Sequence, residues 1–300
     1  MKLRIGSRKS RLALWQTRHV AALLKQHHGG LEIEIVTMDT MGDKISDVPL
    51  PQIGVKGLFT QELEDQLLAK TIDLAVHSLK DLPSTFADGL KFAGAPLRAN
   101  PTDAFISTRW SSLAMLPQHA VLATGSQRRK SQLLSQLPGL RFESLRGNID
   151  TRLRKLDEHG WDGIIMATAA LERLGRMHLV SEELDASIYV PAVAQGAIGV
   201  EICEGRADIE ALLAPIFDPT TNRAVEAERT FLRKLEGGCS VALGAYCHEA
   251  DGLWTFHGWI GSRDGSQVKK ERAQGTDPGA LAAAMADAFI ANGARTILES

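Results

Sequence analysis

Ile72-Asp-Leu-Ala-Val-His77 is the clearest indication of fold in this 300-residue chain, and Ser78-Leu-Lys-Asp81 follows it directly. A short apolar run that comes after the helical spacing of Leu58–Lys70 is typical of a strand buried inside an α/β sheet. Open α/β sheets bind ligands where such strands end. The run therefore predicts both an interior strand and a site beside Asp81.

Strand and helix patterns alternate on both sides of this run. They predict one α/β series in the first third of the chain, a second from about Val121 onward, and a different, smaller α+β region at the end. The expected strands are 2–6, 31–35, 72–77, 121–124, 141–145, 163–167, 243–248, 254–261 and 267–274, and the expected helices are 10–28, 58–70, 127–136, 149–159, 221–235 and 278–292.

Proline-rich segments predict where the chain passes between these regions. Ala95–Pro101 contains two prolines and is suited to a linker or hinge, and Val190-Pro191 is a candidate for the return crossing. The expected fold is α/β, with two doubly wound domains and a small α+β C-terminal domain.

Composition excludes several classes of protein. With 44% apolar residues the chain can bury a full core, and it contains no apolar run long enough for a membrane helix. The three cysteines, Cys203, Cys239 and Cys247, form no C-x-x-C pair, which argues against a disulfide framework, a zinc site and an oxidising compartment. The segment from Met1 to Gly30 carries seven basic and no acidic side chains, but its pattern indicates a strand and a helix rather than a targeting segment.

Basic side chains are concentrated in turns and at helix starts, although the net charge is only −2. Residues 126–155 hold eight basic and two acidic side chains, and arginine outnumbers lysine 21 to 13. Guanidinium groups at such positions favour carboxylate or phosphate ligands. Nucleic acid is disfavoured because aromatic residues make up only 5% and no binding motif is present, and no nucleotide-binding glycine motif occurs.

Two side chains, Cys239 and Asp81, could take part in a reaction, and each could instead have only a structural role. Gly237-Gly-Cys239 follows a predicted helix, so Cys239 is either an accessible nucleophile or attachment point, or a small buried residue in a turn. Asp81 could stabilise a developing cation or transfer a proton, or it could simply open the turn before Pro83.

Six motifs occur in fixed order along the chain. They are Ser7-Arg-Lys-Ser-Arg-Leu-Ala-Leu-Trp-Gln16, Gly54-Val-Lys-Gly-Leu-Phe59, Val76-His-Ser-Leu-Lys-Asp-Leu-Pro83, Ser144-Leu-Arg-Gly-Asn148, Pro191-Ala-Val-Ala-Gln-Gly196 and Leu235-Glu-Gly-Gly-Cys239. Together they resemble the porphobilinogen deaminase (hydroxymethylbilane synthase) family over nearly the whole chain.

The resemblance implies a transferase of tetrapyrrole and haem biosynthesis. Such an enzyme joins four porphobilinogen molecules head to tail with release of ammonia, and water then releases the linear hydroxymethylbilane. Growth starts from a dipyrromethane cofactor bound through a thioether to Cys239, while Asp81 stabilises the cationic azafulvene and assists proton transfer. The resemblance also implies cofactor contacts from Lys80, Ser126, Arg128, Arg129, Arg146, Asp43 and Gln195, and substrate contacts from Arg8, Ser10, Lys56, Arg152 and Arg173.

The same resemblance implies an architecture and a setting. Two domains like those of periplasmic anion-binding proteins, hinged over a cleft, would be formed by residues 1–96 with 197–216 and by residues 102–191. A third domain, 218–300, would carry the cofactor cysteine. The expected protein is a cytoplasmic monomer that binds a small-molecule substrate, and neither a metal, a nucleic acid nor a membrane.

Four positions depart from the family pattern. Gln52 stands where many members have lysine, Gly125 replaces a serine, Ala194 replaces a glycine and Ala242 replaces a proline. The first two put one or two anion contacts in doubt, but none touches Cys239 or Asp81. The alternatives to an enzyme are a non-catalytic binder of a small polyanion and, less favoured, a nucleic-acid-binding protein.

Overall fold

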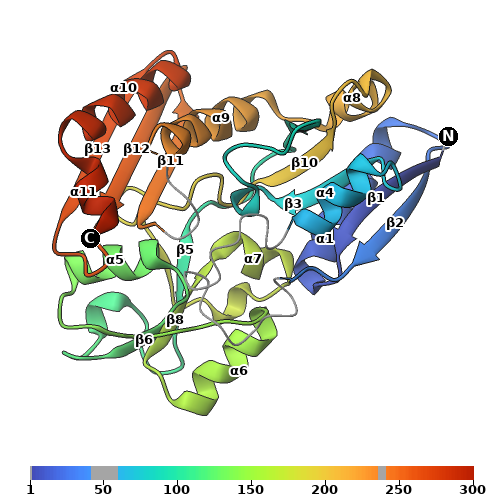
Figure 1. Cartoon of the computed structure of the whole chain (residues 1–300). Helices are drawn as coiled ribbons and strands as arrows, with labels where there is room; N and C mark the ends of the chain where they lie inside the picture. Colours follow the sequence, from blue (N-terminus) through green and yellow to red (C-terminus); the bar gives the residue numbers. More distant parts are fainter. Residues whose placement is uncertain (1, 42–59, 236–240) are drawn as a thin grey trace. The chain divides into compact units, whose positions relative to one another are not determined.

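The computed structural model describes residues 2–41, 60–235 and 241–300, which fall into two compact units (Figure 1). Of these residues, unit 1 takes those up to 41 together with 60–99 and 196–222, and unit 2 takes 100–195 and everything from 223 onward. The chain leaves unit 1 inside the predicted linker and re-enters it at Gly196, whereas Val190 and Pro191 lie within unit 2. The division into three domains stays a prediction.

Unit 1 is built on a five-stranded sheet with the order β2-β1-β3-β10-β4. The strands are β1 (Lys2–Arg8), β2 (Glu32–Met38), β3 (Leu74–Ser78), β4 (Leu90–Gly94) and β10 (Ile198–Cys203). β1 runs parallel to both β2 and β3, while β10 is antiparallel to β3 and β4. β3, the strand predicted from the run Ile72–His77, is therefore an interior strand.

Helices cover both faces of this sheet, as the alternation of side chains along β3 requires. Leu74 and Val76 pack in one core cluster with residues of α1 (Arg11–His27), α8 (Ala207–Leu213) and the short helix η4 (Ala214–Ile216). Ala75 points the other way, into a second cluster with Leu63 and Leu67 of α4 (Gln61–Leu68). Both faces are apolar, which explains the nearly continuous apolar sequence of β3.

Unit 2 contains a second five-stranded sheet, with the order β7-β6-β8-β5-β9. Its strands are β5 (Asp103–Ile106), β6 (Val121–Ala123), β7 (Arg141–Glu143), β8 (Gly163–Ala167) and β9 (Glu182–Leu184). β6 is parallel to β7 and β8, and β5 is antiparallel to β8 and β9. Three parallel strands therefore end at the same edge.

This sheet is also covered on both faces. Phe105, Leu122 and Ile165 pack against Leu133 of α5 (Gln127–Gln136). Their neighbours along the strands point to the opposite face, towards α6 (Ile149–His159) and α7 (Thr168–Arg173). Short 3-10 helices lie at Leu79–Asp81, Leu113–Met115 and Met177–Leu179.

The C-terminal part of unit 2 forms an antiparallel sheet of β11 (Leu243–Ala250), β12 (Leu253–Gly261) and β13 (Val268–Gly275). The accompanying helices are α10 (Pro278–Ala291), α11 (Ala294–Glu299) and, from Arg223 onward, α9 (Pro219–Lys234). Phe231 of α9 contacts Phe256 and Phe289, with ring centroids 5.5 Å apart in each pair. One aromatic cluster thus joins α9 and α10 to the sheet.

The fold class predicted from the sequence is confirmed: two α/β sheets covered by helices, and a smaller sheet at the end. Strands β4, β5, β9 and β10 are not among the elements that the sequence predicts. Cys203 is half-buried at the end of β10, where its thiol donates to the carbonyl of Leu67 (3.0 Å).

Candidate active site

Predicted site residues gather in unit 1 where β1 and β3 end. Arg8 is the last residue of β1, and Asp81 closes the 3-10 turn that follows β3. Because the two strands are parallel neighbours, their carboxyl ends lie at the same edge. A small cavity of about 60 Å³ is lined there by Arg8, Ser10, Ser78 and Asp81, among others. The structure thus brings three predicted residues together, with Lys80 adjacent in the chain.

Helix α1 begins at this cavity. The Ser10 hydroxyl caps the helix by accepting a hydrogen bond from the backbone N–H of Ala13 (3.2 Å). The buried Gln16 side chain donates to the Ser78 hydroxyl (2.9 Å), which ties the helix to the end of β3. The positive end of a 17-residue helix and the Arg8 guanidinium both favour an anion beside Asp81.

Four residues named from the sequence lie outside the described part of the chain. They are Cys239, Asp43, Lys56 and Gln52. Their roles therefore stay predictions. Cys239 belongs to the segment between α9 and β11, so the elements before and after it are described.

In unit 2 the predicted residues follow the three parallel strands. Ser126 comes after β6, Arg146 after β7, and Arg173 ends α7, which follows β8. The carboxyl ends of these strands share one edge of the sheet. Burial lowers the pKa of Arg173 to about 10, so this guanidinium is still charged at neutral pH.

Helix α5 presents the most closely packed group of predicted residues. Ser126 caps it, and Arg128 and Arg129 in its first turn are buried with exposed fractions of 4% and 8%. Both reach Asp103, which is 1% exposed at the start of β5: Nη1 of Arg128 lies 2.8 Å from Oδ2, and Nη2 of Arg129 lies 2.7 Å from Oδ1. Burial alone would raise the pKa of Asp103, but the two arginines outweigh it and hold the pKa below its usual range.

Gln195 completes this cluster. Its Nε2 donates to Oδ1 of Asp103 (2.8 Å) and to the carbonyl of Pro101 (2.8 Å). The preceding residue, Ala194, is held in turn by Glu228 of α9, whose Oε2 accepts from the Ala194 N–H at 2.6 Å. Gln195 is thus fixed by α5, β5 and α9 together.

Arg152 and Arg146 lie around the start of α6. Asn148 caps this helix by accepting from the backbone N–H of Thr151 (2.9 Å). The Arg152 Nε donates to the carbonyl of Gly147 (2.7 Å), which keeps its guanidinium beside the loop that carries Arg146.

Sequence reasoning does not identify Asp103, Gln16 or Glu228. Each is a buried polar residue, and its significance comes from partners that lie far away in the sequence. A signal is present for Asp103, because an acid between Pro101 and the apolar Ala104-Phe-Ile106 needs a partner once that run is buried.

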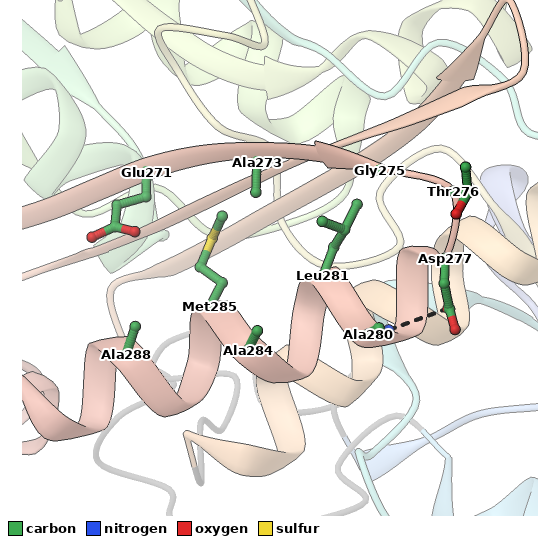
Figure 2. A pocket seen from close by; sticks show the side chains of 10 residues that line it. All are labelled: Glu271, Ala273, Gly275, Thr276, Asp277, Ala280, Leu281, Ala284, Met285 and Ala288. Carbon is green, nitrogen blue, oxygen red and sulfur yellow. Dashed lines mark hydrogen bonds between the residues drawn. The ribbon is translucent and has the colours of Figure 1, made fainter.

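A larger cavity, of about 500 Å³, is lined by none of the predicted residues that the structure describes (Figure 2). It runs between α10 and β13, and Figure 2 shows mostly small side chains along the helix, with Asp277 capping the helix start. Among the described residues, its lining includes the carboxylates of Glu271 and Asp277 but no basic side chain that could bind a carboxylate ligand. We therefore assign the candidate site to the strand ends.

Solved structures that are similar to parts of this chain include the periplasmic VFT2 domain of BvgS from Bordetella pertussis and the methionine-binding protein MetQ. The first is 13% identical with a TM-score of 0.45, covering 76% of this chain and 92% of that one. The second is 14% identical with a TM-score of 0.44, covering 76% and 93%.

Proteins related in sequence are far more similar to this chain than these solved structures are, and the similarity spans nearly the whole chain. Proteins called porphobilinogen deaminase are 43% identical in Syntrophobacter fumaroxidans, over 99% of this chain and 97% of the relative, and 46% identical in Carboxydothermus hydrogenoformans, over 98% and 96%. The relative from Bacillus cereus is 46% identical over 99% and 97%.

Two family models match consecutive parts of the chain. Residues 3–211 match the dipyrromethane cofactor binding domain of porphobilinogen deaminase, and residues 222–291 match its C-terminal domain. Because both models match in order and the relatives are similar over nearly their full length, this chain belongs to the porphobilinogen deaminase family.

Proposed function

We propose that this protein is a hydroxymethylbilane synthase. It would condense four porphobilinogen molecules head to tail, losing one ammonia at each addition, and water would release the linear tetrapyrrole. The observation that carries the proposal is the match of both family models, in order, to almost the entire chain. The strand-end positions of Asp81 and of the arginines support it.

The residues of unit 2 fit a cofactor that brings carboxylates. Arg128 and Arg129 face a single carboxylate, Asp103, so this buried cluster holds a surplus positive charge. The Nε of Arg128 is buried and finds no acceptor within the described residues. An added carboxylate would balance that charge, and the dipyrromethane of this family carries acetate and propionate groups.

Cys239 would hold the cofactor through a thioether, and when bound the cofactor supplies the primer onto which substrate is added. Carboxylates of the cofactor would be bound by Lys80, Ser126, Arg128, Arg129, Arg146 and Gln195, with a further contact from Asp43. Incoming substrate would be bound by Arg8, Ser10, Lys56, Arg152 and Arg173.

Asp81 would be the catalytic carboxylate. Loss of ammonia leaves positive charge on the substrate pyrrole, and an ionised carboxylate beside that charge stabilises it more than it stabilises the neutral ground state. The same oxygen atoms can move a proton during the loss of the amine or the formation of the new carbon–carbon bond. Arg8, the proposed carboxylate-binding group, and Asp81 line the same cavity, which supports these roles.

The expected setting is a cytoplasmic monomer. No helix in the described ranges is both long and apolar enough to cross a membrane.

The intact mass of the denatured protein tests the proposal. We expect a covalent excess equal to two porphobilinogen units less their amines, and no excess in Cys239→Ser. Cys203→Ser is the matched control, because this half-buried cysteine lies outside the proposed site and its variant should keep the adduct. If the unmodified wild type acquires no adduct on incubation with porphobilinogen, a non-catalytic binder of small polyanions becomes the better interpretation.

A further inference from the structure

Asp103 receives four hydrogen bonds or ion pairs in the interior of unit 2. Oδ1 accepts from Nε (3.0 Å) and Nη2 (2.7 Å) of Arg129 and from Nε2 of Gln195 (2.8 Å), and Oδ2 lies 2.8 Å from Nη1 of Arg128. Asp103 opens β5, where Ala167 at the carboxyl end of β8 is its register partner. It therefore lies at the edge of the sheet where the predicted ligand-binding side chains gather.

The two arginines are bound differently. Arg129 uses all three of its nitrogen atoms within the protein, since Nη1 donates to the carbonyl of Ile165 (3.1 Å) and the other two donate to Asp103. Arg128 makes both of its contacts through Nη1, to Asp103 and to the carbonyl of Val190 (2.9 Å). Across the described residues, Nε of Arg128 has no acceptor, whereas Nε of Arg129 is bound to Asp103, so Arg128 keeps a donor that Arg129 has already used.

Arg128 also lies against the strand that follows Cys239. A Cβ atom on Gly244 of β11 would lie 3.3 Å from Cδ of Arg128 and 2.7 Å from the Val190 carbonyl oxygen. The next residue, Ala245, donates to the carbonyl of Pro191 (3.1 Å). The arginine with spare donors is therefore packed against the backbone of the first strand after the proposed attachment cysteine.

We infer that Asp103 is a positioning residue for cofactor binding. Its carboxylate fixes Arg129 as part of the protein framework and holds Arg128 by one nitrogen only, so that Arg128 is presented to a carboxylate of the cofactor. One resident and one incoming carboxylate then balance two guanidinium groups, which a buried site requires. This inference rests on the proposed function.

Asp103→Asn and Asp103→Glu test it. The asparagine keeps the size of the side chain but turns one oxygen into an N–H₂ group that cannot accept from a guanidinium. We expect Asp103→Asn to acquire the covalent adduct at least ten-fold more slowly on incubation with porphobilinogen, and any loaded fraction to have a raised KM with a smaller change in kcat. Asp103→Glu retains the charge, so it should fold and recover part of the loading rate.

Asp162→Asn is the matched control. Asp162 is also a mostly buried aspartate of unit 2, which accepts from the backbone N–H of Val121 (2.8 Å) and from Trp110 (3.1 Å) and does not contact Arg128 or Arg129. This variant should unfold at a lower urea concentration but load the cofactor and bind substrate like the wild type.

Two results separate the inference from the proposed function. If folded Asp103→Asn and Asp103→Glu load the cofactor at the wild-type rate with an unchanged KM, Asp103 has only a structural role and the inference is overturned. If Asp103→Asn fails to fold, Asp103→Glu decides alone. Cofactor loading at the wild-type rate with an unchanged KM overturns the inference, and slower loading with a raised KM supports it. If the wild type itself acquires no adduct, the proposed function fails instead.

Discussion

Glu228 accepts a hydrogen bond from the backbone N–H of Ala194 at 2.6 Å, and Ala194 is in the left-handed conformation with φ of 58°. The other carboxylate oxygen of Glu228 accepts a hydrogen bond from the backbone N–H of Cys247 (2.8 Å). One buried carboxylate on α9 therefore holds both the turn that carries Gln195 and the strand β11. The strained backbone at Ala194 persists because this contact fixes it.

Ala194→Gly should stabilise the protein. Glycine adopts a positive φ without the Cβ clash of alanine, and the gain, reduced by the greater freedom of glycine in the unfolded chain, should be up to about 1 kcal/mol. Urea unfolding measures it. Ala123→Gly in β6, where φ is not positive, is the control and should lose stability; a loss of similar size at Ala194 would contradict the prediction.

Gly125→Ser, which restores the residue common in the family, should destabilise this protein. A Cβ atom at this position would lie 2.7 Å from the carbonyl oxygen of Leu145, so the backbone before α5 must move. The expected cost is about 1–3 kcal/mol, visible as a lower unfolding midpoint. Gly29→Ser has open space around the new Cβ and should be neutral. Equal midpoints for the two variants would show that the loop adapts freely.

Asp81→Asn should abolish most of the turnover and leave the fold intact. The amide cannot stabilise a developing cation as a carboxylate does, and losing one such group lowers the rate by about 10²–10⁴. Ammonia release with porphobilinogen measures the rate, and the thermal midpoint checks folding. Asp88→Asn removes a nearby exposed carboxylate and should have wild-type activity. Turnover by Asp81→Asn within two-fold of the wild type would remove Asp81 from the mechanism.

His257 should make stability depend on pH in the acid range. Burial, together with electrostatic repulsion from His248 and Arg272, lowers its pKa to about 4 from an ordinary value of 6.5. Between these values the unfolded chain binds a proton that the folded protein does not, so stability falls as the pH falls from 6.5 to 4, by about 2 kcal/mol.

His257→Gln should remove this part of the pH dependence. Unfolding midpoints between pH 7 and pH 4 would then decrease less for the variant than for the wild type. His178→Gln, on an exposed turn, should follow the wild-type curve, and identical curves for all three proteins would exclude a depressed pKa at His257.

Elements with local signals can be predicted from the sequence with accurate bounds. Helices α5 and α6 begin after Ser126 and Asn148, whose side chains cap them, and β8 is an uninterrupted apolar run. Strands β5 and β9 are missed because they are held by antiparallel pairing, β5 with β8 and β9 with β5, which no local pattern shows. β10 escapes prediction because its place in the sheet depends on antiparallel pairing with β3, which lies much earlier in the chain.

The same distinction applies to the site. Arg8 and Asp81 can be placed together from the sequence, because residues that follow parallel strands share one edge of a sheet. Whether Arg128 and Arg129 are already paired within the protein cannot be predicted from the sequence in this way. Whether an arginine in the first turn of a helix is a free ligand-binding group or is already paired depends here on Asp103, which belongs to an earlier strand and approaches only through the pairing of β5 with β8.

The position of β10 also determines the order in which the protein can be completed during synthesis. β10 lies between β3 and β4 in the first sheet, yet the whole stretch 100–195, which belongs to the other unit, separates it from β4 in the chain. A ribosome-bound chain that ends before residue 198 leaves the hydrogen-bonding edges of β3 and β4 open. Residues 100–195 therefore emerge while the first sheet is incomplete, and exposed strand edges at this stage are where chaperones would bind and where pairing errors would begin.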